Sequence, residues 1–423
     1  MQDLVVIDSK NLKTGGILAA VVIAVLVFGW FSVRWQLGNL LATLTQTSDP
    51  NVTAIADLAI RLAPSDPSAY SLKAAAGEDP LNSVNALEQA VRRAPFDYRW
   101  RTELGRAYEQ NGQIEQAEIQ LKKAVELAPS YSSARWHLGN FYLRQEQEEK
   151  AIAELKIAAE NNPIYRDQVF SLAWDYFDKD AGKIENLAGD RPDLRARLAY
   201  FFAARGRAEE SLRNWNRLSD GDKAKNVVLA RAIALGLYDQ RHFPQSLDFL
   251  RQFGAENEAK PEAITNGSFE TNIGETEDSR FGWQILRNDA KIDAMTDGKV
   301  KREGSRSLRV SFRSFIKPTL ANIFQTVVVE PGKRYSLRFW VRTENLRSAG
   351  TPMIEIINAN DDRSIARSPA LATGTNDWQE MSIDFAAPPG CSGISIRTIR
   401  AFCGEECPIT GILWYDDFEL TER

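Results

Sequence analysis

The sequence predicts a multidomain α + β protein: an N-terminal transmembrane helix, then an α-solenoid of helix hairpins, then an antiparallel β-sandwich. Three observations lead to this fold class. An uncharged apolar stretch lies near the N-terminus, and a 34-residue spacing of small and large residues recurs in the middle of the chain. Beyond residue 263 the hydrophobic period changes from 3.6 to 2, which indicates strands.

The apolar stretch runs without a charge from Thr14 to Val33, between Lys13 and Arg34. A helix of about 20 apolar residues rises about 30 Å, which matches the hydrocarbon core of a bilayer. The alternative is a cleaved signal peptide, which has a shorter apolar region followed by a cleavage site between small residues. No such site precedes Arg34, so we expect an uncleaved transmembrane anchor over residues 14–35.

The charges that flank this stretch predict its orientation. Lys10, Lys13 and the terminal amine precede it, whereas only Arg34 follows closely. The excess of positive charge before the span predicts a cytoplasmic N-terminus over residues 1–13. We therefore expect a single-pass protein of the inner (cytoplasmic) membrane, with the bulk of the chain in the periplasm.

Composition argues against two classes of function. The net charge of −5 disfavours nucleic acid as a partner, because phosphate binding needs a basic surface. The chain has 2 histidines, His137 and His242, and lacks the Gly-rich phosphate loop, the His-Glu-x2-His helix motif and the Gly-x-Ser-x-Gly turn. The adjacent carboxylates Asp361 and Asp362 would point to opposite faces of a strand, unlike the facing pair of a glycoside hydrolase. We expect no enzyme activity.

A 34-residue offset relates two stretches of the middle region. The motif Leu-Gly-x2-Tyr occurs at 104–108 and again at 138–142, and Pro129 recurs as Pro163. Small residues at these positions let two antiparallel helices approach closely, and proline ends the second helix. The pattern resembles the tetratricopeptide repeat and matches it best over 98–165.

Weaker copies of the repeat extend the expected solenoid to residues 50–254. The spacing reappears near Leu198 and near Ile233, and five or six helical pairs fit the whole region. The resemblance implies a scaffold that binds protein partners. The alternative is a spacer that holds the C-terminal domain away from the membrane.

The C-terminal region reads as a β-sandwich. A polar stretch that ends near Pro261 predicts a linker over 255–263, because proline disfavours helix at the residue before it. Beyond it, apolar and polar residues alternate along segments such as Tyr335–Arg342, with Gly, Pro, Asn and Asp between the segments. We expect short antiparallel strands over residues 264–423.

Five motifs follow one another along this domain. They are Asn266-Gly267-Ser268-Phe269-Glu270, Gly282-Trp283, Gly304-x2-Ser307-Leu308, Pro331-Gly332-x2-Tyr335 and Trp414-Tyr415-Asp416-Asp417-Phe418. In this order they resemble the carbohydrate-binding modules with a galactose-binding-like jelly roll that accompany bacterial glycanases. The resemblance implies the fold, whereas the ligand class needs evidence from the site, since this fold serves many binding functions.

The same resemblance implies a structural calcium ion where the first and last strands meet. The implied ligands are Glu270 of the opening motif and Asp416 or Asp417 of the closing motif, with backbone carbonyls near 301–304. Hard oxygen ligands of this kind suit Ca²⁺, which takes six to eight of them. The alternative is that these carboxylates are exposed and pair with lysine or arginine.

Outward positions of the expected strands supply candidate glycan contacts. An indole ring can stack on a sugar ring, and arginine binds carboxylates or phosphates through two parallel hydrogen bonds. These residues predict a face for an acidic glycan or a negatively charged protein. In the alternative, the arginines pair with acidic residues across strands. The candidates are Trp340, Arg309, Arg313, Arg338, Arg342 and Arg397.

The three cysteines, Cys391, Cys403 and Cys407, are disulfide candidates. Cys403 and Cys407 lie close together in a turn-like stretch and would close a loop in an oxidising compartment. The odd number leaves one thiol free, so the spacing alone does not assign the pair. No histidine is near, which disfavours a zinc site.

These observations together predict a membrane-anchored, non-catalytic scaffold of a bacterial envelope. The solenoid would bind protein partners and the sandwich a glycan. Analogy of architecture suggests the assembly or export of exopolysaccharide or surface polysaccharide. The alternative is a protein–protein assembly factor of an envelope complex, whose sandwich does not bind sugar.

Overall fold

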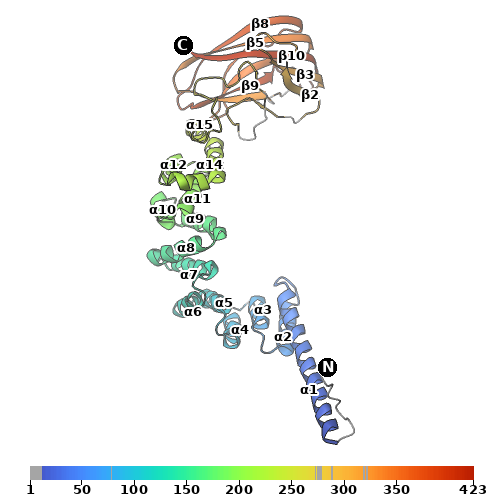
Figure 1. The fold of residues 1–423 in the computed structure, drawn as a ribbon, viewed down its shortest axis with the longest axis vertical. Coiled ribbons are helices and arrows are strands. Elements are labelled where there is room, and N and C mark those ends of the chain that lie inside the picture. The colour runs from blue at the N-terminus through green and yellow to red at the C-terminus, as the bar shows by residue number, and fades with distance from the viewer. Residues whose placement is uncertain are drawn as a thin grey trace, which may run out of the picture. The chain divides into compact units, whose positions relative to one another are not determined.

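The computed structural model describes residues 12–77, 79–271, 273, 279–286, 289–317, 320 and 323–423. The chain divides into two compact units, Met1–Gly189 and Asp190–Arg423. The described part of unit 1 is helical, and that of unit 2 combines five helices with ten strands, which confirms the multidomain α + β fold class (Figure 1). Most of the expected cytoplasmic segment 1–13 falls on residues 1–11, which lie outside the described residues.

The helices of unit 1 follow one another along the chain, and each contacts the next (Figure 1). Their bounds are α1 (Leu12–Leu44), α2 (Val52–Leu62), α3 (Pro67–Ala76), α4 (Pro80–Arg93), α5 (Tyr98–Gln110), α6 (Ile114–Leu127), α7 (Ser132–Arg144), α8 (Glu148–Asn161), α9 (Pro163–Tyr176) and α10 (Ala181–Ala188).

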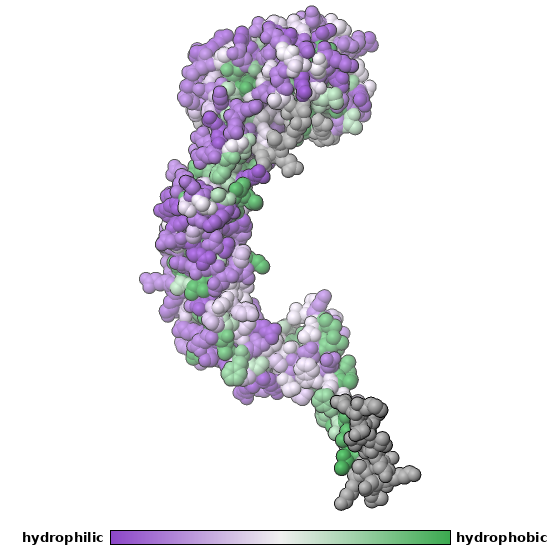
Figure 2. Space-filling view, viewed as in Figure 1, coloured by the Kyte–Doolittle hydropathy of each residue, from purple (hydrophilic) through white to green (hydrophobic). Residues whose placement is uncertain are grey.

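Helix α1 is the one helix in the described part of the chain that is long and apolar enough to cross a membrane, over Gly15–Leu44. Its large apolar side chains are exposed, and Figure 2 shows them as a green surface beside the grey atoms. Insertion into lipid would remove this surface from water. A signal sequence passes the same test of length and composition.

The last turns of α1 pack against α2 and α3. A Cβ atom at Gly38 would lie 2.6 Å from the Cβ of Ala63, so only glycine allows this approach. The amide of Asn39 donates to the carboxylate of Asp66 at 2.8 Å. Helical packing therefore begins before residue 50, where we expected the solenoid to start. The reason is that α1 continues as an unbroken helix past the end of the expected span.

The 34-residue period corresponds to one contact that recurs in successive hairpins. In α5/α6 a Cβ at Gly105 would lie 2.7 Å from Cγ of Leu121, and in α7/α8 a Cβ at Gly139 would lie 2.7 Å from Cγ of Leu155. Both leucines are fully buried. Each glycine thus lets a leucine of the partner helix reach the helix backbone, and the expected tetratricopeptide-type packing is confirmed.

Short polar side chains fix where several of these helices begin. Asp66, Asp79, Asp97 and Asn162 each accept a hydrogen bond from the backbone N–H two residues later. This contact satisfies an N–H group that has no partner inside the helix. Proline follows three of the four residues, where its fixed φ suits the first turn.

In unit 2 the weaker repeats form two further hairpins, α11/α12 and α14/α15, with α13 between them. Their core includes Trp215, which is 1% exposed and whose ring centre lies 5.5 Å from that of Phe249. The bounds are α11 (Pro192–Ala203), α12 (Ala208–Asn216), α13 (Asp220–Lys225), α14 (Val227–Asp239) and α15 (Phe243–Gln252).

Among the described residues that come next, ten strands form two five-stranded sheets, and their pairing is antiparallel, as the sequence predicts. One sheet has the order β1-β4-β9-β6-β7 and the other β2-β3-β10-β5-β8. The strands are β1 (Gln284–Ile285), β2 (Ile292–Asp297), β3 (Ser307–Phe315), β4 (Ile323–Val328), β5 (Arg334–Arg347), β6 (Pro352–Asn358), β7 (Ser364–Arg367), β8 (Gly374–Ala386), β9 (Gly393–Arg400) and β10 (Ile409–Glu422).

The core of the sandwich lies between the two sheets and is rich in aromatic rings. On β5, Leu337, Phe339 and Val341 are buried and alternate with outward residues. The ring of Phe339 stacks on that of Phe418 from β10, with centres 4.9 Å apart. The period of two thus identified the inner face of β5 correctly.

The segment 255–263, where we expected a linker, packs against the sandwich. The carboxylate of Glu256 is buried and accepts the backbone N–H groups of Arg280 and Phe281. The backbone N–H of Glu262 donates to the carbonyl of Val328 at 2.8 Å. Glu256, part of the polar stretch that predicted a linker, thus satisfies two backbone donors of the sandwich.

The last helical hairpin also contacts the sandwich within unit 2. The hydroxyl oxygens of Tyr238 on α14 and Thr326 on β4 are 2.7 Å apart. Arg241, between α14 and α15, forms an ion pair with Asp362 at 2.5 Å. Val328 of β4 is buried in the same core as the residues of α14 and α15. The hairpin and the sandwich therefore share one hydrophobic core.

Candidate functional site

The outer face of sheet β2-β3-β10-β5-β8 presents most of the expected glycan-binding residues. Arg338, Trp340 and Arg342 alternate with buried residues on β5, so they point away from the core. Arg309 faces outward from β3 in the same way. Trp414 of β10 lies in register between Arg309 and Arg342. Arg313 follows Ser311 on the outward side of β3, so the structure brings five of the six candidates to one face.

A cleft of about 570 Å³ opens on this face beside Trp340. Its lining combines one indole with two guanidinium groups and three carboxylates. An aromatic surface with a few convergent polar groups is typical of a site for a small polar ligand. The lining residues are Gly267, Ser268, Arg302, Arg338, Trp340, Glu380, Asp417, Phe418 and Glu419.

Arg302 contributes to this cleft from the loop before β3. Its guanidinium carbon lies 4.0 Å from the centre of the Trp340 ring, in a cation–π contact. The same guanidinium forms ion pairs with Asp417 at 2.6 Å and Glu303 at 3.0 Å. Arg302 therefore covers part of the ring face on which a sugar would stack.

Two further carboxylates hold the loop that carries Arg302. Asp416 is fully buried and accepts the backbone N–H of Arg302 at 3.0 Å, and burial raises the pKa of its carboxyl to about 6. Glu270 accepts the backbone N–H of Ser305 at 2.8 Å. A Cβ at Gly304, where φ is +61°, would lie 2.1 Å from the Glu270 carboxylate, so this turn requires glycine.

The three expected calcium ligands, Glu270, Asp416 and Asp417, therefore all contact the loop before β3, but each contacts a different group of it. Their oxygens accept N–H groups or pair with Arg302, and a cation would compete with these donors. The described residues contain no group of three or more His, Cys, Asp or Glu placed to hold a metal ion. The calcium site stays a prediction.

Arg309 and Arg342 lie around a second tryptophan on the same face. Trp414 is 3% exposed, and its indole N–H donates to Asp297 at 3.0 Å. The guanidinium carbon of Arg342 lies 5.9 Å from the Trp414 ring, and Arg309 pairs with Asp293 at 3.5 Å. These side chains extend the face beyond the cleft, but Trp414 itself is not available for stacking.

Arg313 lies on the same face, exposed toward the end of β3, but outside the cleft lining. Arg397 belongs to β9 in the opposite sheet and pairs with the buried Glu355 at 2.6 Å. Placing Arg397 on one face with the other candidates was wrong, because alternation along a strand shows which residues face outward but not which sheet holds the strand.

Sequence reasoning also missed Arg302, Glu380 and Glu419. Glu380 and Glu419 flank Arg338 from β8 and β10, and Glu419 forms an ion pair with it. These contacts depend on strand register across the sheet. The sequence analysis names the stretch 301–304 for its backbone carbonyls only. This was the one local feature that drew attention to the region of Arg302.

Unit 1 has its own exposed aromatic surface at the loop between α4 and α5. Phe96 is 84% exposed and Tyr131 is 59% exposed. The Tyr131 ring lies 5.1 Å from that of Tyr98, and Arg93 and Arg99 line the same open cleft. Exposed aromatic and arginine side chains are enriched where proteins bind each other.

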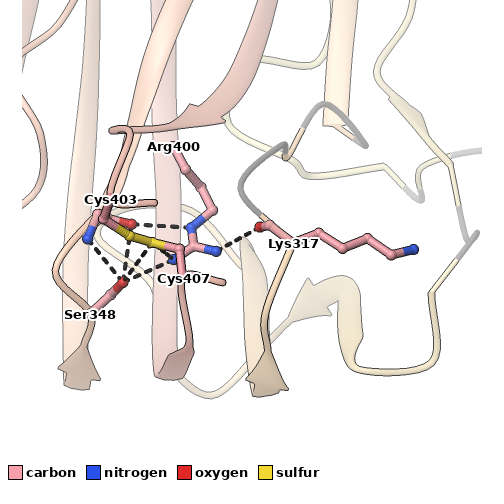
Figure 3. The surroundings of a disulfide bond; sticks show 6 residues. Lys317, Ser348, Arg400, Cys403 and Cys407 are labelled. Atoms are coloured by element: carbon pink, nitrogen blue, oxygen red, sulfur yellow. Dashed lines mark hydrogen bonds between the residues drawn. A yellow bond between two sulfur atoms is a disulfide. The ribbon is translucent and has the colours of Figure 1, made fainter. Parts of the chain in front are cut away.

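Cys403 and Cys407 form a disulfide, and Cys391 is a buried free thiol. The disulfide closes the loop between β9 and β10. Figure 3 shows Ser348 and Arg400 next to it, with Lys317 nearby. The side chain of Arg400 donates to the Cys407 sulfur at 2.9 Å and to the Ser348 hydroxyl at 2.9 Å.

Comparison with known families finds two matches. Residues 261–399 match the family described as carbohydrate binding domain, and residues 71–132 and 102–163 match the tetratricopeptide repeat. Both are binding domains without catalytic function; the tetratricopeptide repeat suggests protein binding and the other carbohydrate binding. No curated protein matches the chain.

Solved structures resemble each part of the chain. A structure described as "CBM4 structure and function" is 15% identical, covers 38% of this chain and 99% of its own, and has a TM-score of 0.29. A structure of MamA from Desulfovibrio magneticus RS-1 is 26% identical and covers 31% of this chain and 74% of its own, with a TM-score of 0.27. The CBM22-1 xylan-binding domain of Paenibacillus barcinonensis Xyn10C is 12% identical and covers 39% and 97%, with a TM-score of 0.26.

Proposed function

We propose that this chain, in which tetratricopeptide repeats and a carbohydrate-binding domain follow a long apolar helix, is a membrane-anchored, non-catalytic binding protein of a bacterial envelope. The repeats bind protein partners, and the sandwich binds a glycan during the assembly or export of exopolysaccharide or surface polysaccharide. The observation that carries the glycan part is the cleft beside Trp340, within the domain that matches a carbohydrate-binding family.

The chemistry of the cleft favours an acidic glycan. Arg302 and Arg338 lie on its lining with Trp340, and a guanidinium group binds a carboxylate through two hydrogen bonds. Both arginines are paired with carboxylates of the protein, Arg302 with Asp417 and Arg338 with Glu419. A uronate of the ligand would exchange with these partners, and the Trp340 ring would contact the sugar ring.

A titration tests this proposal directly. The full chain in detergent is titrated calorimetrically with a uronic-acid oligosaccharide and with a neutral oligosaccharide of the same length. We expect binding of the acidic ligand and a loss of about two- to twelvefold in Trp340→Ala, because stacked aromatic contacts contribute about 0.5–1.5 kcal/mol. The absence of binding by the parent protein to either ligand would exclude the glycan function.

A matched pair of arginine variants controls for net charge. Arg338→Gln removes a guanidinium from the cleft, whereas Arg363→Gln removes one from the exposed turn between β6 and β7. We expect weaker binding of the acidic ligand in the first and unchanged binding in the second. Equal losses in both variants would indicate general electrostatic attraction and not a site.

The proposed anchor is supported by α1, whose Gly15–Leu44 segment has the length and composition of a span. The bulk of the chain would lie in the periplasm, with residues 1–13 in the cytoplasm, as the flanking charges predict. Carbonate extraction of membranes should leave the protein in the pellet, and external protease should digest it in spheroplasts but not in intact cells. A soluble, shortened form would indicate a cleaved signal peptide.

The proposed protein partner would bind unit 1. The exposed rings of Phe96 and Tyr131 give it an apolar surface bordered by Arg93 and Arg99. Co-purification from detergent-solubilised membranes, with quantitative mass spectrometry of parent and Phe96→Ala protein, identifies partners that depend on this surface. Enrichment of polysaccharide-synthesis or export components would support the proposed process.

The alternative is an assembly factor whose sandwich no longer binds sugar. One observation favours it: Arg302 lies over the Trp340 ring and is tied to Asp417 and Glu303. The two functions differ in the titration and the co-purification. A partner that co-purifies, together with no glycan binding by the parent protein or by Arg302→Ala, would favour the assembly factor.

A further inference from the structure

Arg400 is a buried cation without a carboxylate partner in the described part of the chain. Its side chain is 6% exposed. Its nitrogens donate to two carbonyl oxygens, of Gly350 at 3.1 Å and Lys317 at 2.8 Å. The remaining contacts are the Ser348 hydroxyl and the sulfur of Cys407, both at 2.9 Å. Burial lowers the pKa of the Arg400 guanidinium, as expected when no anion compensates its charge.

The surroundings are built tightly around the disulfide (Figure 3). A Cβ atom at Gly350 would lie 2.8 Å from the sulfur of Cys403 and 3.0 Å from that of Cys407. The N–H of Gly350 donates to the Ser348 hydroxyl at 3.1 Å, which orients that hydroxyl beside Arg400. Backbone and side chains thus place one positive charge against one of the two sulfurs.

A positive charge at this place affects the oxidised and the reduced forms unequally. In the disulfide the Cys407 sulfur is neutral and gains little from a cation. In the reduced form a Cys407 thiolate would give Arg400 the counter-ion that it now lacks. An opposite charge within about 4–6 Å typically shifts a pKa by about 1–3 units. The buried cation should therefore stabilise the reduced form.

We propose that the Cys403–Cys407 disulfide is a reversible redox site that exchanges two electrons with a dithiol, and that Arg400 stabilises the thiolate of Cys407 in the reduced form. Cys407 is fully buried, whereas Cys403 is half-buried in an otherwise exposed loop. Cys403 is accordingly the sulfur that an external thiolate reaches. This proposal does not depend on glycan binding.

The exchange balances as an ordinary thiol–disulfide reaction. One thiolate of the external dithiol attacks the sulfur of Cys403 and forms a mixed disulfide. The bond to Cys407 breaks, and Cys407 leaves with the electron pair as a thiolate beside Arg400. The second thiolate of the dithiol then attacks the mixed disulfide and releases Cys403, which takes up a proton. The protein has gained two electrons, and the dithiol has become a disulfide.

The equilibrium with dithiothreitol measures the proposed effect. The full chain in detergent is equilibrated with mixtures of reduced and oxidised dithiothreitol, quenched with acid, and its thiols are counted by mass after alkylation. A Cys407 pKa two units below that of a free thiol would make reduction at pH 8.5 about fifty-fold more favourable, or about 50 mV. Arg400→Gln should lose this advantage, and Arg400→Lys should keep most of it.

The pH dependence separates this effect from a purely structural one. At pH 6 a Cys407 thiol would be largely protonated with or without the arginine, so parent and Arg400→Gln should differ less than twofold. The other charged residues nearest the disulfide along the chain and its flanking strands, Lys317, Arg347, Glu405 and Glu406, are exposed. A difference of equal size at pH 6 and pH 8.5, or no difference at either, would overturn the proposal.

A second measurement needs no change at Arg400. In Cys403→Ser the Cys407 thiol is titrated through its thiolate absorbance near 240 nm. Burial raises the pKa of the Cys391 thiol to about 11, so Cys391 does not contribute below pH 9. We expect Cys407 to titrate below pH 7.5. A midpoint at or above about 8.5, the value of a free thiol, would exclude the proposed role of Arg400 even if Arg400→Gln fails to fold.

Discussion

The guanidinium group of Arg302 lies over the indole ring of Trp340, with 4.0 Å between its carbon and the ring centre. The two residues come from different elements, the loop before β3 and the middle of β5. Ion pairs with Asp417 and Glu303 hold the guanidinium in place. Arg302 therefore covers the ring. Its charge attracts an anionic ligand, and its position hinders a sugar from stacking on the indole.

This relationship predicts how Arg302→Ala changes ligand preference. Removal of the side chain uncovers the Trp340 ring, which favours a neutral oligosaccharide, and it removes a cation that an acidic one would pair with. Both effects lower the ratio of acidic to neutral affinity. We expect the ratio to fall at least tenfold in calorimetric titrations of the full chain.

Lys301 supplies the control for this comparison, because it is the exposed neighbour of Arg302 and carries the same charge. Lys301→Ala should leave the affinity ratio within about twofold of the parent, since exposed charges are strongly screened by salt. An unchanged ratio in Arg302→Ala would contradict a role of this contact in ligand choice.

The buried carboxyl of Asp416 predicts a pH-dependent stability. Burial raises its pKa to about 6 in the folded chain, against about 3.9 in an unfolded one. The folded state therefore binds this proton more tightly, and its relative stabilisation is present below about pH 4 and lost as the pH rises through 6. A shift of this size corresponds to about 3 kcal/mol at most.

Asp416→Asn should remove this pH dependence. The asparagine loses one of the two acceptors that bind backbone N–H groups, so the variant is less stable at every pH by about 1–3 kcal/mol. Urea unfolding of the full chain at pH 4 and pH 7 should show that the parent exceeds Asp416→Asn in stability by more at pH 4 than at pH 7. The stability of Asp377→Asn, at an exposed position, should differ from that of the parent by the same amount at both values of pH; a difference between parent and Asp416→Asn that does not change with pH would refute the buried-carboxyl explanation.

The features that follow from local periodicity could be predicted from the sequence. The spacing of Gly105 and Gly139 identified helix crossings, and alternation along β5 identified the inner and outer residues, because both depend on neighbours within one element. The contact of Arg302 with Trp340 could not be predicted, since it depends on how a loop folds over a finished sheet. The sheet assignment of Arg397 failed for the same reason, because strand order is a property of the whole domain.

Two boundaries illustrate the same limit. Arg34 ends the uncharged stretch, but the helix continues past it, and its guanidinium donates to the carbonyl of Arg61 at 2.8 Å. Glu256 suggested a solvated linker, but its carboxylate accepts two backbone N–H groups of the sandwich. In both cases a charged side chain satisfies a backbone group that is distant in the sequence, so composition alone was misleading.

The glycine contacts of the repeats predict opposite effects for two similar substitutions. Gly139→Ala places a Cβ 2.7 Å from Cγ of Leu155 in a packed hairpin, and it should destabilise the helical region by about 1–3 kcal/mol. Gly221→Ala lies in the exposed helix α13 with its nearest neighbouring atom 3.9 Å away, and it should stabilise by up to about 1 kcal/mol through helix propensity.

Urea unfolding of the full chain followed by far-UV circular dichroism compares the two variants. The transition of Gly139→Ala should move to lower urea and that of Gly221→Ala should stay or move slightly higher. An unchanged transition in Gly139→Ala would mean that the hairpins tolerate a methyl group at their crossing, and that the recurring Gly–Leu contact does not explain the period.

The packing of segment 255–263 predicts that Glu256 holds the segment to the sandwich. Glu256→Ala leaves the N–H groups of Arg280 and Phe281 without their acceptor, at a cost of about 1–3 kcal/mol. We expect faster hydrogen exchange and faster proteolytic cleavage within 255–263. Glu258 is two residues away and exposed, so Glu258→Ala should exchange and cleave like the parent. Rapid hydrogen exchange throughout this segment in the parent protein would contradict this packing and support the linker that the sequence predicted.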